Sequence, residues 1–141
     1  MCENKRTGVL NFQRFKGVDF ANNIRLPNID FATVHNYPDN WQIGAFDFEW
    51  VNENFIADRA NISHAAGKPI IMEEFGMKAG YLPSRDTLLN SNGDAALAAG
   101  FAGLLTWQTL AYDNINVGYS FSWGQDGSTA LQRLTETMRR M

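Results

Sequence analysis

The chain has 141 residues, 45% hydrophobic and 19% charged, a balance typical of one globular domain with a hydrophobic core. The formal net charge of −3 argues against a nucleic-acid partner, because phosphate binding needs clustered lysine and arginine. A single cysteine, Cys2, excludes an internal disulfide and a cysteine-based zinc site. No apolar run approaches the roughly 18 to 20 residues of a membrane span, so we expect no membrane partner.

The first buried segment is IDFATVHNY, residues 29–37, which is rich in β-branched and aromatic residues. This composition predicts a strand. Apolar residues at helical spacing then predict a helix near residues 47–66. Asp47 is a suitable N-cap for this helix, and Gly67 fits its C-cap.

The same order is repeated twice along the rest of the chain. PIIMEE predicts a strand near residues 69–74, followed by a helix near 86–99. AGLLTW predicts a third strand near 102–107, and an amphipathic helix follows near 126–140. The apolar face of this last helix consists of Leu131, Leu134 and Met138. Strands that alternate with helices predict an α/β fold with parallel strands, apolar along their length and covered on both faces.

All three predicted strands end in polar or aromatic residues. These are His35 and Tyr37, Glu73 and Glu74, and Trp107 and Gln108. An acid at the end of a buried strand has two explanations, since it either caps a strand that stops at water or is a catalytic group. In α/β sheets and β/α barrels the active site forms at the carboxyl edge of the strands. Three such endings in succession favour a site.

The stretches IDFATVHNYPDNW, GKPIIMEEFG and GLLTWQ, in this order, resemble family 5 glycoside hydrolases, most closely the endo-β-1,4-mannanases of plants and fungi. The resemblance runs from about Gly17 to the end of the chain. It implies that residues 1–141 form one partial catalytic domain, the C-terminal part of a TIM (β/α)8 barrel with about the last three strand–helix units. Three strands do not close such a barrel by themselves.

The resemblance also implies roles for individual residues. Glu74, the acid before the Phe-Gly pair, matches the family's nucleophile. Tyr37 matches the tyrosine that donates a hydrogen bond to the nucleophile and favours its ionised form. His35 resembles the active-site histidine near the acid/base. Trp107 matches the platform on which a sugar stacks, and Trp41 is a weaker candidate for a neighbouring subsite.

Other aromatic and acidic residues have less specific expectations. Because neighbours in a strand point to opposite faces, Glu73 is expected to face the helices or solvent, paired with a lysine or arginine. Trp50 is expected in the core. Three aromatic residues in the loop after the last strand have two open interpretations, sugar stacking or packing against the barrel rim. They are Tyr112, Tyr119 and Trp123.

The mechanism implied is retaining hydrolysis of a neutral β-1,4-mannan-type polysaccharide, with no metal and no organic cofactor. It needs a second carboxylate as acid/base, which in the family follows an asparagine at the end of an earlier strand. The pair Asn52-Glu53 lies within a predicted helix, so we do not assign it this role. We therefore expect a fragment that lacks the acid/base half.

Two alternatives remain open. The chain is then either an inactive carbohydrate-binding half-barrel or part of a β-1,4-glucanase or exo-glycosidase of the same clan. The family implies an extracellular location, although the stretch MCENKRTGVLNFQRF lacks the apolar core of a signal peptide.

Overall fold

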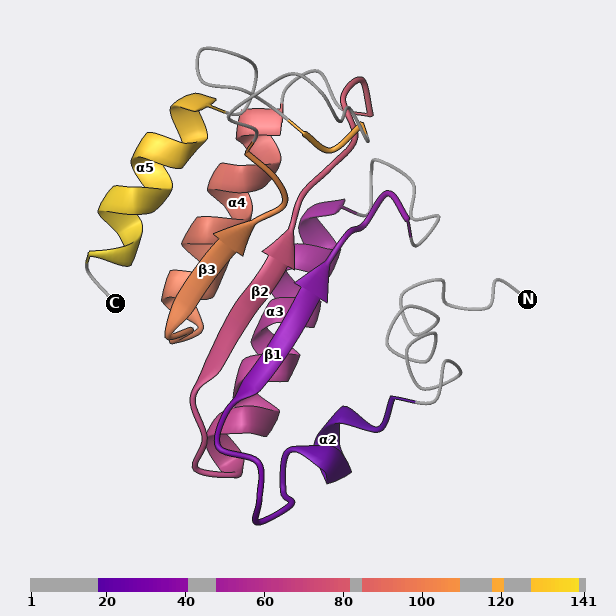
Figure 1. Cartoon of the computed structure of the whole chain (residues 1–141), viewed down its shortest axis with the longest axis vertical. Helices are drawn as coiled ribbons and strands as arrows, with labels where there is room; N and C mark the ends of the chain where they lie inside the picture. Colours follow the sequence, from indigo (N-terminus) through magenta and orange to yellow (C-terminus); the bar gives the residue numbers. More distant parts are fainter. Residues whose placement is uncertain (1–17, 41–47, 82–84, 110–117, 121–127, 140–141) are drawn as a thin grey trace.

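The computed structural model describes residues 18–40, 48–81, 85–109, 118–120 and 128–139. Its elements are α2 (Phe20–Asn23), β1 (Ala32–Asn36), α3 (Phe48–Ala65), β2 (Ile70–Phe75), α4 (Arg85–Ala98), β3 (Gly103–Thr106) and α5 (Ser128–Met138). The strands are parallel in the order β1-β2-β3, and their arrows point the same way in Figure 1. The predicted α/β fold with an open parallel sheet is thus confirmed.

The three strands and three long helices begin and end within three residues of the predicted bounds, whereas the short helix α2 was not predicted. Asp19 is its N-cap and accepts a hydrogen bond from the Asn22 main-chain N–H at 3.2 Å. Distant residues hold the segment in place. The Lys68 ammonium donates to two carbonyls just beyond the helix at 2.6 Å each, and the Arg59 guanidinium lies 5.2 Å from the centre of the Phe20 ring.

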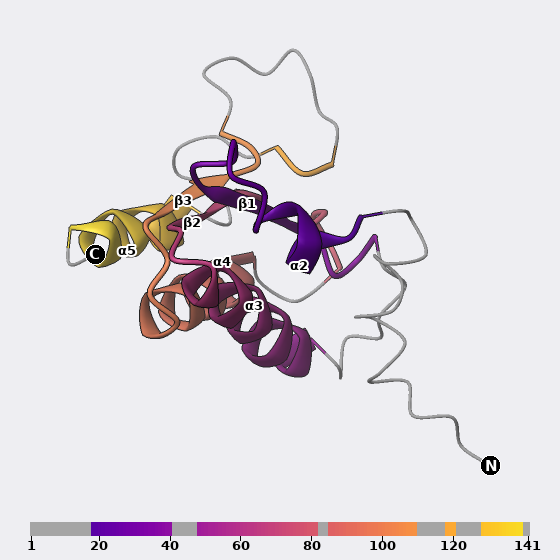
Figure 2. The same cartoon turned by 90° about the horizontal axis from the view of Figure 1, so that it is seen from below.

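Helices α3 and α4 lie against one face of the sheet (Figure 2). Alternate side chains of the strands point to this face, as the two-residue period of a strand requires. The main core forms between the sheet and the helices. Its buried members are Ile24, Ala32, Val34, Phe55, Ile56, Ala60, Ile70, Met72, Phe75, Leu89, Ala96, Phe101, Leu104, Ala130 and Leu134.

The opposite face of the sheet is more open. Phe31 is 51% exposed and Leu105 is 57% exposed. In the part of the chain that the structure describes, no helix covers this face (Figure 2), so the expected cover on the second face is not supplied by these residues. In a closed barrel, side chains of other strands fill this space. The apolar character of the strands therefore fits a barrel lining.

The helix ends follow the predicted chemistry where they are described. Gly67 terminates α3 with φ +70°, a left-handed conformation that glycine adopts without strain. Its N–H donates to the His64 carbonyl at 2.9 Å. The predicted C-cap is therefore confirmed, whereas Asp47, the predicted N-cap, lies outside the described residues.

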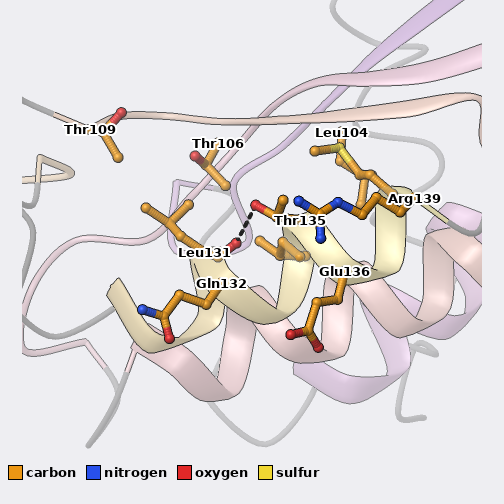
Figure 3. A pocket seen from close by; sticks show the side chains of 10 residues that line it. Leu104, Thr106, Thr109, Leu131, Gln132, Thr135, Glu136 and Arg139 are labelled. Atoms are coloured by element: carbon orange, nitrogen blue, oxygen red, sulfur yellow. Dashed lines mark hydrogen bonds between the residues drawn. The ribbon is translucent and has the colours of Figure 1, made fainter.

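A pocket of about 490 Å³ lies between β3 and α5 and extends to Thr106 and Thr109 at the carboxyl end of β3, but neither Glu74 nor Trp107 lines it. Figure 3 shows side chains from both elements around it, including Leu104 on β3 and Leu131 on α5. Of the predicted apolar face of α5, Leu134 is 4% exposed, Leu131 is partly buried and Met138 is 39% exposed. Met138 lines the pocket rather than the core, because the outer edge of β3 has no neighbouring strand in the described sheet.

Candidate active site

Polar and aromatic side chains gather where the three strands end. Tyr37 directly follows β1, Glu74 is the last residue but one of β2, and Trp107 directly follows β3. Main-chain pairing continues past the strands, because the Trp107 N–H donates to the Phe75 carbonyl at 2.8 Å. These side chains therefore share the carboxyl edge of the sheet, where α/β enzymes form their sites.

Tyr37 and Glu74 are joined by a short hydrogen bond. The Tyr37 hydroxyl donates to Glu74 Oε2 at 2.7 Å, which is the contact that the resemblance implies. Burial, together with the hydrogen bond to the carboxylate, raises the pKa of Tyr37 well above its ordinary value. The phenol thus stays a donor throughout the neutral range. The side chain of Glu74 is 30% exposed, so its carboxylate stays accessible from solvent.

A β-bulge lies next to this pair. Val34 pairs with Met72 and His35 pairs with Glu74, so Glu73 has no partner on β1. The pairing of β2 with β3 also shifts between Met72 and the end of the strand. An extra residue of this kind bends the strand and changes the direction of its side chains. The bulge therefore decides how the two adjacent acids are presented.

His35 lies beside both acids. Its Nε2 is 3.2 Å from Glu73 Oε2, and its Nδ1 is 3.5 Å from Glu74 Oε2. The prediction that Glu73 and Glu74 face opposite sides is wrong, because the bulge interrupts the alternation. Glu73 is exposed to solvent as expected, but its partner is His35 rather than a lysine or arginine.

The ring of Tyr119 packs against the ring of Tyr37. The two rings meet edge to face, with centroids 5.2 Å apart and planes at 79°. The Tyr119 hydroxyl donates to Asp39 Oδ2 at 2.8 Å, and Asn40 Oδ1 lies at the same distance. Burial and the Asp39 carboxylate raise the pKa of Tyr119 above its ordinary value. At 9% exposure Tyr119 packs against the site, which decides its two open interpretations in favour of packing.

Residues 118–120 also form hydrogen bonds with the loop after β2 and with the first residue of α4. The Ala79 N–H donates to the Gly118 carbonyl at 2.9 Å, and the buried Arg85 donates to the Ser120 carbonyl at 2.9 Å. Asp39 also accepts from the Lys78 main-chain N–H at 3.3 Å. Sequence reasoning missed Asp39. The signal available was its place just after Tyr37-Pro38, at a strand end.

Trp107 presents an exposed aromatic surface at the same edge. Its side chain is 41% exposed, which is unusual for a residue of this size and leaves room for a ligand. Its carbonyl oxygen approaches Gly76 so closely that a β-carbon there would overlap it. Gly76 thus allows the chain after β2 to pass close to the end of β3. The peptide bond between Trp107 and Gln108 is cis.

Several predicted residues lie outside the described part of the chain. They are Trp41, Tyr112 and Trp123. Asn52 and Glu53 lie within α3, whose main chain is helical there. This helical placement is the one expected when Asn52-Glu53 was not assigned the acid/base role. Trp50 is in the same helix, and its side chain is not among those described.

The described residues contain no group of three or more His, Cys, Asp or Glu side chains arranged to hold a metal ion. Within the same residues, no helix is both long and apolar enough to cross a membrane. What the edge does offer is a carboxylate with a phenol donor, an imidazole beside it and an exposed indole. This combination suits chemistry on a neutral, hydroxyl-rich ligand.

Comparison with known proteins finds relatives of similar sequence. The chain is 40% identical over 131 residues to mannan endo-1,4-β-mannosidase 7 of Arabidopsis thaliana, covering 80% of this chain and 30% of that protein. It is 33% identical over 117 residues to mannan endo-1,4-β-mannosidase A of Aspergillus aculeatus, covering 81% and 27%. The chain therefore spans about a third of the length of these relatives. No family model matches it.

Solved structures share the fold. The endo-1,4-β-mannanase of Rhizomucor miehei superposes with a TM-score of 0.76 at 25% identity, over 89% of this chain and 34% of that one. The hyperthermostable endo-1,4-β-D-mannanase of Thermotoga petrophila RKU-1 gives the same TM-score at 19% identity, over 89% and 38%. In sequence and fold the chain is thus a partial match to the glycoside hydrolase family 5 endo-1,4-β-mannanases, one that covers a fraction of the full enzymes.

Proposed function

We propose that the chain supplies the nucleophile side of a retaining β-1,4-mannan hydrolase. The observation that carries this proposal is the 2.7 Å hydrogen bond from the Tyr37 hydroxyl to Glu74 Oε2 at the carboxyl edge of the sheet. A phenol donor stabilises the carboxylate form, which is the form that attacks. The accessible side chain of Glu74 leaves room for a sugar beside it.

The proposed reaction has two displacements at the anomeric carbon. Because Tyr37 and His35 both contact Oε2, the attack comes from Glu74 Oε1. The carboxylate forms a bond to the anomeric carbon while the glycosidic bond breaks. A protonated carboxyl group roughly 5 to 5.5 Å away gives its proton to the leaving oxygen. The same group then takes a proton from water, whose oxygen displaces Glu74 and releases the sugar with retained configuration.

The substrate class rests on the relatives and on Trp107. The matching proteins from Arabidopsis and Aspergillus are mannan endo-1,4-β-mannosidases by name. An exposed indole binds the C–H face of a sugar, and no charged partner is needed for a neutral polysaccharide. We therefore assign β-1,4-mannan to this chain, with Trp107 as the platform beside the scissile bond.

The second carboxylate is proposed to come from the remaining barrel strands. The outer edges of β1 and β3 are unpaired in the described sheet, and the pocket beside β3 is lined by the half-exposed Met138. Both features fit further strand–helix units packing there. The chain also covers only 30% of the Arabidopsis relative.

The test is a fusion in which this chain replaces the matching segment of Arabidopsis mannosidase 7. The fusion should release reducing ends from β-mannan, and Glu74→Gln should lower the rate by roughly 10³-fold or more. Glu53→Gln on α3 is the matched control and should keep the rate. A 2-deoxy-2-fluoro-mannoside with a good leaving group should label the Glu74 peptide in mass spectrometry. Full turnover in Glu74→Gln would disprove the nucleophile assignment.

Binding without cleavage is a second candidate, favoured by the 41% exposure of Trp107. The full 141-residue chain would then bind manno-oligosaccharides by itself, and Trp107→Ala would remove the binding. Parallel assays with β-1,4-glucan separate a mannanase from a glucanase. If the fusion is inactive on both polymers but the chain binds mannan, the binding function is the correct one.

A further inference from the structure

Glu73 has no role in the proposed reaction, yet it contacts His35 beside the nucleophile. Glu73 Oε2 lies 3.2 Å from His35 Nε2, at the limit of an ordinary hydrogen bond, whereas Glu74 Oε2 lies 3.5 Å from Nδ1. Of the two acids, Glu73 therefore makes the better contact with the imidazole. The side chain of Glu73 is 47% exposed and that of His35 is 48% exposed, so neither of these two is fixed by burial.

The bulge in β2 creates this contact. Glu73 has no partner on β1, and the register of β2 shifts against both neighbouring strands at this point. With regular pairing, His35 would face a single acid. The extra residue places one acid at each ring nitrogen, Glu73 at Nε2 and Glu74 at Nδ1. Bulges recur beside active sites because they redirect a side chain in this way.

We propose that Glu73 is a positioning residue that fixes the tautomer and the orientation of His35, an inference that rests on Glu74 being the nucleophile. A neutral imidazole has one N–H donor and one acceptor. When Nε2–H donates to Glu73, Nδ1 presents a lone pair toward Glu74. Tyr37 is then the donor on Glu74 Oε2, and the carboxylate keeps its nucleophilic character.

The removal of Glu73 reverses this arrangement. Glu74 then becomes the carboxylate within reach of the ring, and the imidazole places its proton on Nδ1 to donate to it. Glu74 Oε2 would accept from both Tyr37 and His35. Two donors stabilise the negative charge and weaken the attack on the anomeric carbon. Glu73 therefore acts through His35 without touching the substrate.

The tautomer is measured directly by NMR of the 141-residue chain labelled with ¹⁵N-histidine, at a pH where the imidazoles are neutral. The sequence has two histidines. His64, whose Nε2 lies 3.2 Å from the Gly100 carbonyl, serves as an internal reference. The wild-type chain should show Nε2–H for His35, and Glu73→Ala should shift it to predominantly Nδ1–H. Glu73→Gln, whose amide oxygen still accepts, should restore Nε2–H.

Asp30→Ala is the matched control, because it removes an exposed carboxylate near the other end of β1. In the fusion with the Arabidopsis relative, Glu73→Ala should lower kcat roughly 10-fold with little change in KM, and Glu73→Gln should recover most of the loss. Identical ring-nitrogen shifts of His35 in wild type and Glu73→Ala would overturn the proposal, as would an Nδ1–H tautomer in the wild type. The NMR result is independent of hydrolysis, so an inactive fusion refutes only the proposed function.

Discussion

The carbonyl oxygen of Trp107 occupies the space that a β-carbon on Gly76 would need. A methyl group there pushes the chain after β2 away from the end of β3. We expect Gly76→Ala to lower the free energy of unfolding by about 1 to 3 kcal/mol, the usual cost of overpacking. Urea denaturation measures this change. The control is Gly103→Ala, whose new β-carbon would be 3.5 Å from Ile71 Cγ2, an ordinary contact. Equal losses in both variants would mean that the approach of Trp107 is not what constrains Gly76.

Removal of the Tyr37 hydroxyl should impair catalysis without disrupting the fold. Tyr37→Phe keeps the ring that meets Tyr119 but loses the 2.7 Å hydrogen bond to Glu74. A hydrogen bond to a charged group contributes about 1.5 to 3 kcal/mol, so kcat/KM of the fusion should fall by roughly 10- to 150-fold. Steady-state kinetics on manno-oligosaccharides gives this ratio. A fall of similar size in Tyr119→Phe would show that the effect is general loosening of the site.

Stability at alkaline pH should depend on the half-buried Tyr37 and the buried Tyr119. Their pKa values are raised in the folded chain, chiefly by burial. Above about pH 10, the ordinary tyrosine pKa, the unfolded chain releases these protons while the folded chain keeps them. Their contribution to stability is therefore fully present below pH 10 and is lost as the pH rises toward the folded values. Urea denaturation between pH 8 and 11 should show a smaller decline in the Tyr37→Phe, Tyr119→Phe double variant. An unchanged slope would contradict the assignment to these tyrosines.

The open side of α5 makes a prediction about the further strand–helix units that we propose beside β3. Leu134 is 4% exposed, so Leu134→Ala should cost about 2 to 5 kcal/mol in the chain alone. Met138, on the same helix, is 39% exposed. Met138→Ala should therefore lower the free energy of unfolding by less than about 1 kcal/mol. In the fusion the Met138→Ala cost should rise, because the pocket beside β3 is then covered. Denaturation of both variants in both contexts tests this, and an unchanged Met138 cost would argue against a neighbour at this edge.

Trp107→Ala should weaken manno-oligosaccharide binding about 10-fold, equivalent to roughly 1.4 kcal/mol. The exposed indole contributes surface rather than charge, so the loss should be insensitive to salt. Calorimetric titration of the 141-residue chain, or of the fusion if the chain alone does not bind, gives the affinity. Trp107→Phe should recover part of it, because a smaller ring still stacks. Equal affinities in wild type and Trp107→Ala would contradict the assignment of Trp107 as a sugar-binding platform.

The parallel order of the strands and the place of the site follow from local sequence. Each apolar run has its polar or aromatic residue at its own end, so His35, Tyr37 and Glu74 could be proposed as candidates without knowledge of the pairing. The bulge at Glu73 was not predictable, because it arises from the register between strands that are distant in sequence. Sequence alternation alone therefore gave the wrong face for one acid.

The contacts of Tyr119 and the helix α2 were missed for a similar reason. Tyr119 reaches Asp39 across eighty positions of the chain, and no local pattern indicates such a partner. Helix α2 has four residues, too few for a periodic signal, and Lys68 and Arg59 hold it from outside. Long-range ties of this kind decide structure where local propensity is weak.

In the sheet formed by the described residues, the outer edges of β1 and β3 have no neighbouring strand, which has a consequence for the chain in isolation. They belong to opposite sides of one parallel sheet, so the β3 edge of one copy complements the β1 edge of the next. Such a head-to-tail contact has no symmetry that stops it after two copies, and it adds copies in a row unless the rotation happens to close a ring. With no neighbour at these edges, the chain is expected to associate with rising concentration into assemblies of no fixed size.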